Sequence, residues 1–218
     1  MTYKKKLAIF DFCDTIFNGQ SISYFLDFLE LKLPIHKKLY SKIRKRFNQI
    51  PSSDSKKYKE YLLKVYNEIS KYEMESYSEE FFKTVIRNRL HKVVIEKLLE
   101  HKNQGHRIII VSGGFENYLK YFVNEYQVDY LLSTKLEFEN GKFTSKIDGN
   151  ECLGIEKVKQ LKQLDLNNYD LENSYVYSDH HSDKPLFDLV GNKVLVKNKQ
   201  NTKWANDRYK ILDVSSNA

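Results

Sequence analysis

The sequence predicts an α/β protein with a parallel sheet covered by helices on both faces. Short apolar runs of strand length recur along the chain, each bounded by polar residues or glycine. Segments with helical three-four spacing lie between them, and this alternation is typical of a parallel sheet. Acidic or small polar residues follow several of the runs, where open α/β sheets bind ligands. The expected strands are 7–10, 107–111, 130–132, 175–177 and 193–196, and the expected helices are 91–104, 116–126, 154–164 and 183–190.

Two segments depart from this alternation. Residues 136–144 alternate around Asn140-Gly141, which predicts a β-hairpin beside the core. Residues 18–88 show helical spacing throughout, with breaks at Pro34 and at 51–54, where Asp54 is a candidate helix N-cap. We therefore expect a core made of residues 1–17 and 89–218, and a helical insertion at 18–88.

Composition limits the classes of protein. A chain of 218 residues with 41% hydrophobic content can bury a substantial core. Its two cysteines, Cys13 and Cys152, form no disulfide framework or metal-type spacing, which favours a reducing compartment. No apolar stretch has the length of a signal sequence core or a membrane span. The expected location is cytoplasmic, with no membrane partner.

A basic run contributes much of the net charge of +7. Lysines and arginines occur between Lys32 and Arg46 without an acidic residue after Lys32. Such a run is most often a solvated helix face; steering of an anionic substrate and a nucleic-acid surface are the alternatives, in that order. We expect no nucleic-acid partner.

The candidate chemistry begins directly after the first expected strand, at Asp11-Phe12-Cys13-Asp14-Thr15. A carboxylate at a strand end can serve as a nucleophile, which divides phosphate ester hydrolysis into two steps. Ser112 and the amides of Gly113 and Gly114 form a donor cluster suited to phosphate oxygens at a helix start.

Three further residues complete the pattern. Lys157 opens a helical stretch and could neutralise phosphate, or be an exposed lysine. Asp179 follows the strand at 175–177, and Asp183 comes four residues later. Asp183 could contribute to a metal site or only cap a helix. His180 and His181 are a second, less favoured option as metal ligands.

These motifs, in this order, resemble those of the haloacid dehalogenase superfamily, especially its phosphoserine-phosphatase-like branch (subfamily IB), over about residues 5 to 197. The resemblance implies a Rossmann-like catalytic core with a small helical cap after the first strand. It implies that Asp11 is the nucleophile that forms an aspartyl-phosphate and that Ser112 holds the phosphate. Lys157 would then neutralise the phosphate and keep Asp11 ionised. It also implies a Mg²⁺ site formed by Asp11, the carbonyl of Cys13, Asp179 and Asp183.

One position departs from the family pattern. The usual first motif is Asp-x-Asp-Gly-Thr, but here Cys13 stands where the second Asp belongs and Asp14 where the Gly belongs. The family's second Asp protonates the leaving oxygen and then activates water. Because a thiol is a weak donor, we expect Asp14 to take this role.

The expected function is that of a Mg²⁺-dependent phosphatase acting on a small-molecule phosphate monoester. A phosphorylated amino alcohol, polyol or sugar derivative, as in surface-polysaccharide or related metabolism, is the preferred substrate class. The alternatives are a phosphoserine phosphatase proper and a catalytically silent relative that binds phosphorylated ligands. The helical cap is expected to choose the substrate.

Overall fold

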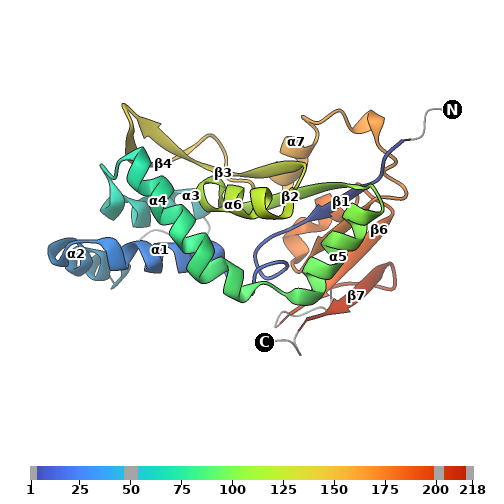
Figure 1. Ribbon diagram of the computed structural model, residues 1–218, viewed down its shortest axis with the longest axis horizontal. Helices are drawn as coiled ribbons and strands as arrows, with labels where there is room; N and C mark the ends of the chain where they lie inside the picture. The colour runs from blue at the N-terminus through green and yellow to red at the C-terminus, as the bar shows by residue number, and fades with distance from the viewer. Residues whose placement is uncertain (1–3, 47–53, 199–203, 215–218) are drawn as a thin grey trace.

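A single seven-stranded sheet forms the centre of the molecule (Figure 1). The computed structural model describes residues 4–46, 54–198 and 204–214, with only the backbone at 40 and 42–46. The strand order is β4-β3-β2-β1-β5-β6-β7, and all neighbours are parallel except β3 and β4. The strands are β1 Leu7–Phe10, β2 Arg107–Phe115, β3 Tyr130–Glu139, β4 Lys142–Asp148, β5 Tyr175–Ser178, β6 Asn192–Lys197 and β7 Tyr209–Asp213.

The central strand β1 is buried on both faces. It pairs with β2 on one side and β5 on the other, and its four side chains have no exposed surface. Ala8 and Phe10 belong to one hydrophobic cluster, whereas Leu7 and Ile9 belong to another on the opposite face. This burial explains the continuous apolar run in the sequence. Asp11 follows at the carboxyl end of the strand.

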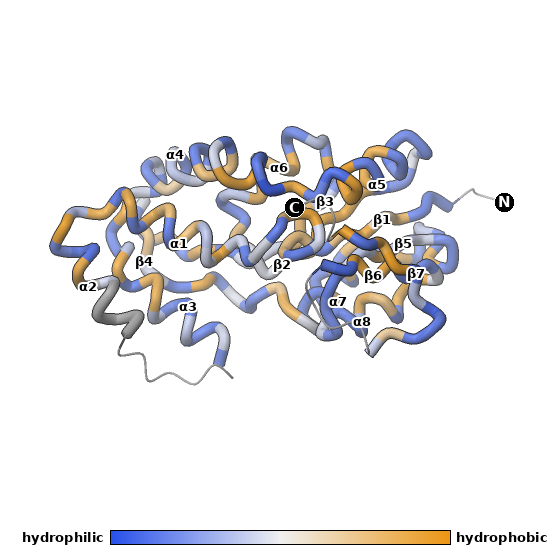
Figure 2. Tube along the Cα trace, turned by 90° about the horizontal axis from the view of Figure 1, so that it is seen from below, coloured by the Kyte–Doolittle hydropathy of each residue, from blue (hydrophilic) through white to orange (hydrophobic). Residues whose placement is uncertain are grey.

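Helices cover both faces, as predicted. The helices α5 (Lys92–Asn103) and α6 (Glu116–Tyr126) contribute to the first cluster. The helices α7 (Ile155–Leu161) and α8 (Lys184–Phe187) contribute to the second. Figure 2 shows these two pairs on opposite sides of the strands. Among the described residues, no helix is long and apolar enough to cross a membrane.

The segment between β1 and β2 is helical, as its spacing predicts. Its helices lie at the end of the molecule opposite β7 (Figure 1). Asp54 accepts a hydrogen bond from the backbone amide of Lys57 at 3.1 Å, so the expected N-cap is confirmed. The elements are the α-helices α1 Ser21–Lys32, α2 Ile35–Arg46, α3 Ser55–Leu63 and α4 Lys71–Phe81, the 3₁₀ helices η1 Lys64–Tyr66 and η3 Arg87–Arg89, and the π-helix η2 Phe82–Ile86.

The helical insertion shares its core with the sheet. Phe25, Met74 and Phe81 from the insertion belong to the same buried cluster as Phe115 and Phe122. The division into an insertion at 18–88 and a core at 1–17 and 89–218 therefore stays our proposal, based on chain order rather than on separate cores.

Part of the basic run lies on α2. Lys32, at the end of α1, forms an ion pair with Glu80 at 2.6 Å, and Lys37 and Lys38 are half-buried. The side chains at 42 and 44–46 lie outside the described residues.

The predicted hairpin is confirmed, and the structure shows that it extends the sheet and contacts the insertion. Asn140 and Gly141 both adopt positive φ angles, 50° and 76°, as a tight hairpin turn requires. The hairpin is formed by β3 and β4 at the sheet edge, and its tip pairs with the insertion. The amide of Lys71 donates to the carbonyl of Gly141 at 2.8 Å, and that of Phe143 donates to Ile69 at 2.9 Å. The hairpin therefore joins core and insertion.

Several element boundaries differ from the prediction. Strand β2 continues through Gly113 and Gly114 to Phe115, with a register irregularity, so these glycines end a strand and do not begin α6. Strand β7 was not predicted, because its side chains are exposed or half-buried and it has one neighbouring strand. The helix expected at 183–190 is reduced to the four-residue α8.

Candidate active site

The carboxyl ends of β1, β2 and β5 meet at one cavity of about 450 Å³. The core side of this cavity is lined by Asp11, Gly113, Gly114, Lys157 and Asp179, together with Cys13, Leu153, His180, Ser182 and Asp183. Helices α1 and α3 of the insertion line the other side. The fold thus brings together residues far apart in sequence at the carboxyl ends of the strands, where the sequence pattern predicted a ligand site.

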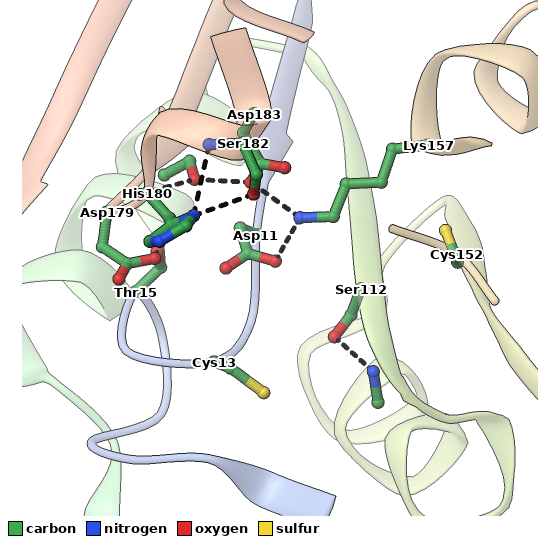
Figure 3. A network of polar contacts seen from close by, with 12 residues as sticks. Asp11, Cys13, Thr15, Ser112, Cys152, Lys157, Asp179, His180, Ser182 and Asp183 are labelled. Carbon is green, nitrogen blue, oxygen red and sulfur yellow. Dashed lines mark hydrogen bonds and ion pairs between the residues drawn. The ribbon is translucent and has the colours of Figure 1, made fainter. Parts of the chain in front are cut away.

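Lys157 is the buried cation of the site. Its Nζ lies 2.7 Å from Oδ1 of Asp11 and 2.7 Å from Oδ2 of Asp183 (Figure 3). All three side chains are at most 9% exposed. Burial acts to lower the pKa of Lys157, but the two carboxylates outweigh it and raise that pKa overall. Lys157 is therefore a charged residue of the cavity and not an exposed surface lysine.

Asp183 faces the site and does not cap α8 with its side chain. Its Oδ2 accepts a hydrogen bond of 2.6 Å from the Ser178 hydroxyl in addition to that from Lys157. Its Oδ1 is buried without a hydrogen-bond donor among the described residues. Ser178, which sequence reasoning did not single out, holds Asp183 from the end of β5.

Burial disfavours the ionised forms of the Asp179 and Asp11 carboxyl groups. Asp179 is 4% exposed, and its Oδ1 accepts a long hydrogen bond of 3.4 Å from Oγ1 of Thr15. Burial, followed by the charges of Asp11 and Asp14, raises the pKa of Asp179 to about 8. Burial also raises the pKa of Asp11 to about 6, although Lys157 opposes the shift. Lys157 alone therefore does not offset the cost of ionising both groups, and a further cation would.

This charge balance suits a hard cation. Among the described residues no cluster of three or more His, Cys, Asp or Glu side chains forms a metal site by itself. Mg²⁺ commonly uses only one or two carboxylates and completes its shell with waters and substrate oxygens. Asp179, the bare Oδ1 of Asp183 and Asp11 therefore fit a site completed by such oxygens.

The residues expected to bind phosphate lie at the end of β2. Gly113 and Gly114 line the cavity, whereas Ser112 is fully buried and its Oγ accepts a hydrogen bond from the amide of Gly114 at 3.0 Å (Figure 3). A Cβ on Gly114 would lie 2.9 Å from the Tyr118 hydroxyl oxygen, and one on Gly113 would overlap Leu153. The close approach of buried Tyr118 favours glycine at 114, whereas the Leu153 side chain is partly exposed and can move away from position 113.

Cys13 occupies the cavity wall where the family motif has its second Asp. Its Sγ lies 3.1 Å from Oγ of Ser21, which in turn lies 2.8 Å from the hydroxyl of Tyr118. Burial raises the pKa of the Cys13 thiol to about 11, so the group is neutral. Asp14 is not among the described residues that line the cavity, and its carboxylate accepts hydrogen bonds from Gln20 and Asn198.

Of the two histidines considered as metal ligands, only His180 lies at the cavity. His180 lines the cavity, with Nδ1 2.9 Å from Oγ of Ser182, and accepts a hydrogen bond from the amide of Ser182. His181 is not among the described lining residues. Sequence reasoning also missed Tyr58 and Lys59 of α3, because helical spacing does not indicate which turn faces a distant strand end.

Comparison with known proteins places this geometry in a family. A model of the haloacid dehalogenase-like hydrolases matches residues 8–188. A probable phosphatase of Mycobacterium tuberculosis is 24% identical over 123 residues, which is 52% of this chain but only 42% of that protein, so the match spans less than half of its length.

Two solved structures show the same fold. A protein of unknown function from Bordetella pertussis has a TM-score of 0.73 at 22% identity, covering 89% of this chain and 91% of the other. A phospho-aspartyl intermediate analogue of phosphoserine phosphatase has a TM-score of 0.60 at 20% identity, covering 89% and 87%. The predicted fold class and phosphoserine-phosphatase-like resemblance are confirmed.

Proposed function

The chain belongs to the haloacid dehalogenase-like hydrolases, and on this premise we propose that it is a Mg²⁺-dependent phosphatase of a small-molecule phosphate monoester. The observation that carries the proposal is the position of Asp11. Its carboxylate stands at the end of β1, in the cavity, 2.7 Å from the charged amine of Lys157. A nucleophile beside a fixed cation is what attack on an anionic phosphate requires.

The reaction proceeds in two steps. An oxygen of Asp11 attacks phosphorus, the new P–O bond forms, and the bond from phosphorus to the alcohol oxygen breaks with its electrons on that oxygen. The leaving oxygen takes up a proton, for which Asp14 is the proposed donor. Water then attacks phosphorus, the bond to Asp11 breaks, and inorganic phosphate and the free carboxylate result. The proton that the attacking water loses returns to the donor.

The chain's own residues prepare both steps. Lys157 neutralises charge on the phosphoryl oxygens and keeps Asp11 ionised, while Gly113, Gly114 and the Ser112 hydroxyl orient those oxygens. Asp11, Asp179, Asp183 and the carbonyl of Cys13 would hold Mg²⁺, which would supply positive charge for the same oxygens. Asp183 also holds the amine of Lys157 through a second hydrogen bond of 2.7 Å.

The alcohol part of the ester lies against the helical insertion in this proposal. A phosphorylated amino alcohol, polyol or sugar derivative stays the sequence-based expectation, and phosphoserine is the alternative that the family resemblance supplies. In either case the phosphate of the ester binds at Asp11 and its alcohol part points toward α1 and α3.

The test is phosphate release from a panel of phosphate esters, including p-nitrophenyl phosphate, with and without Mg²⁺. We expect turnover that a chelator abolishes and that excess Mg²⁺ restores. Asp11→Asn should lose turnover while keeping its circular dichroism spectrum. A folded Asp11→Asn protein with substantial activity would rule out the aspartyl-phosphate route, and failure of the parent protein on every ester would favour a silent phospho-ligand binder.

A further inference from the structure

The cavity has two chemically different walls. The wall on the core side carries the charged residues Asp11, Lys157 and Asp179. The wall formed by the insertion carries Ile22, Leu26, Tyr58 and Leu62, and Leu153 adds a further apolar side chain from the core. If the phosphate occupies the charged wall, as the proposed function requires, then the alcohol part of the ester meets a largely apolar wall.

Two of the apolar side chains that line the cavity keep exposed surface. Tyr58 is 37% exposed and Leu153 is 40% exposed, although both line a cavity. Large apolar side chains that line a hollow and keep exposed surface are typical of a ligand site. An apolar group bound in the cavity would remove part of this surface from water.

The charge on the insertion wall is already neutralised. Among the described lining residues that the insertion contributes, Lys59 is the only charged one. It forms an ion pair with Glu151, which also accepts a hydrogen bond from Ser55 at 3.3 Å. The side chain of Lys59 is 17% exposed and that of Glu151 is 9% exposed. A carboxylate on the substrate would have to share the Lys59 ammonium with Glu151, a nearly buried carboxylate that already uses it, which weakens the attraction.

We propose that the preferred substrate is the phosphate ester of an uncharged, largely apolar alcohol, and not that of an amino acid or a polyol. The inference rests on the proposed function for the position of the phosphate, and it replaces the sequence-based expectation of an amino alcohol, polyol or sugar derivative as the alcohol. The neutral polar side chains Gln20 and Ser23 on the same wall leave room for one hydroxyl or amide group on the alcohol. They do not match the many hydroxyls of a sugar.

The direct test compares esters of primary alcohols with different side groups. Hexyl phosphate, phosphoserine and glucose 6-phosphate have similar leaving oxygens, so differences in kcat/KM report the fit of the alcohol. We expect kcat/KM for hexyl phosphate to exceed that for either other ester by about tenfold or more, the scale of discrimination that an apolar pocket supplies. Equal or higher kcat/KM for phosphoserine or glucose 6-phosphate would overturn the inference.

A binding measurement tests, without turnover, whether the insertion wall prefers an apolar group. Hexylphosphonate and 2-amino-4-phosphonobutyrate cannot be hydrolysed as esters, and titration calorimetry with Mg²⁺ gives their Kd. We expect hexylphosphonate to bind about tenfold more tightly. Tighter binding of the aminophosphonate overturns this inference alone and leaves the phosphatase proposal in place. Binding of neither, together with no ester hydrolysis, overturns both.

Two leucines of nearly equal exposure provide a matched pair of variants. Leu153 lines the cavity at 40% exposure, whereas Leu99 on α5 is 42% exposed and is not among the lining residues. Leu153→Asn should reduce kcat/KM for hexyl phosphate about tenfold and reduce that for phosphoserine much less. Leu99→Asn should change neither. Equal losses on both esters in Leu153→Asn would contradict an apolar alcohol site.

The ion pair gives a gain-of-function test. Glu151→Gln keeps the shape and removes the charge that occupies Lys59. The preference for hexyl phosphate over phosphoserine should then fall by about tenfold, because Lys59 becomes available to the substrate carboxylate. An unchanged preference would show that Lys59 does not reach the alcohol position and would contradict the argument from the ion pair.

Discussion

Gln20 donates a hydrogen bond of 2.6 Å to Oδ2 of Asp14. Asn198 holds the other oxygen of the same carboxylate at 3.3 Å, and Asp14 adopts a positive φ of 53° in the turn after β1. The side chain proposed as proton donor is therefore held beside the cavity, while Cys13 faces into it. To act on substrate, Asp14 must exchange one of these hydrogen bonds.

The role of Asp14 can be separated from that of Cys13 by the leaving group. Protonation matters for the basic oxygen of an alkyl alcohol and little for p-nitrophenolate. We expect Asp14→Asn to slow hydrolysis of alkyl phosphates about 10²-fold and that of p-nitrophenyl phosphate much less. Cys13→Ala should cost little on either ester, because only its carbonyl is used. Asp14→Asn that is harmless on alkyl esters would show that Asp14 only shapes the turn.

Lys157 and Lys159 offer a matched comparison on one helix. Lys157 is buried between Asp11 and Asp183, whereas Lys159 is 62% exposed and paired with Glu156. Lys157→Met should reduce kcat by about 10²–10³-fold. It should also destabilise the fold by about 3 kcal/mol, because two buried carboxylates lose their cation. Lys159→Met should change neither value. Steady-state kinetics and urea unfolding measure both effects, and equal behaviour of the two variants would contradict the assignment.

Gly191 tests the packing of the turn before β6. A Cβ at this position would overlap the carbonyl oxygen of Glu172, which belongs to the backbone and cannot rotate away. Gly191→Ala should therefore lower the free energy of unfolding by about 3 kcal/mol. Gly105 has no atom within 4 Å of its Cβ position but a φ of 76°, so Gly105→Ala should cost only about 1 kcal/mol. Chemical denaturation gives the free energy of unfolding of each variant. A larger loss for Gly105→Ala than for Gly191→Ala would contradict the close approach of Gly191 to Glu172.

His101 makes the fold sensitive to acid. Its ring nitrogens lie 2.8 Å from Nδ1 of His106 and 2.8 Å from the Tyr177 hydroxyl, and burial, followed by the His106 charge, lowers its pKa to about 4. An unfolded chain protonates the same ring near its ordinary pKa of about 6.5. Stability is therefore fully present above this value and is lost as pH falls toward 4.

The comparison that isolates this effect is the slope of Tm against pH. His101→Gln retains a polar group for Tyr177 but does not titrate, so its Tm should fall less between pH 7.5 and pH 5 than that of the parent protein. His36→Gln, at an exposed position on α2, is the control and should keep the parental slope. Parallel curves for His101→Gln and the parent would refute the assignment.

The sequence predicted the parts of the site that depend on local pattern. Asp11 was identified because a strand buried on both faces is a continuous apolar run, and the residue after it lies at the carboxyl end of the sheet. The hairpin at Asn140-Gly141 was identified because few residues adopt positive φ. The role of Lys157 came from the family resemblance, since nothing local marks a lysine that reaches Asp11, 146 positions away.

The residues of the insertion that line the cavity could not be predicted from local sequence pattern. Tyr58 and Lys59 lie on α3, where helical spacing shows one buried face but not its partner. The partner of Lys59 is Glu151, 92 positions later in a loop. Strand β7 was missed for a related reason, since an edge strand needs little apolar surface and leaves a weak pattern.

The backbone hydrogen bonds between the insertion and the hairpin tip have a consequence for shortened versions of this chain. Residues 68–71 run along Gly141 to Phe143 and satisfy amides and carbonyls on the outer side of β4. Deleting the insertion would leave that side as a bare strand edge, ready to pair with another molecule. A core expressed without residues 18–88 should therefore self-associate, both through this edge and through the apolar surface that Phe25, Met74 and Phe81 cover.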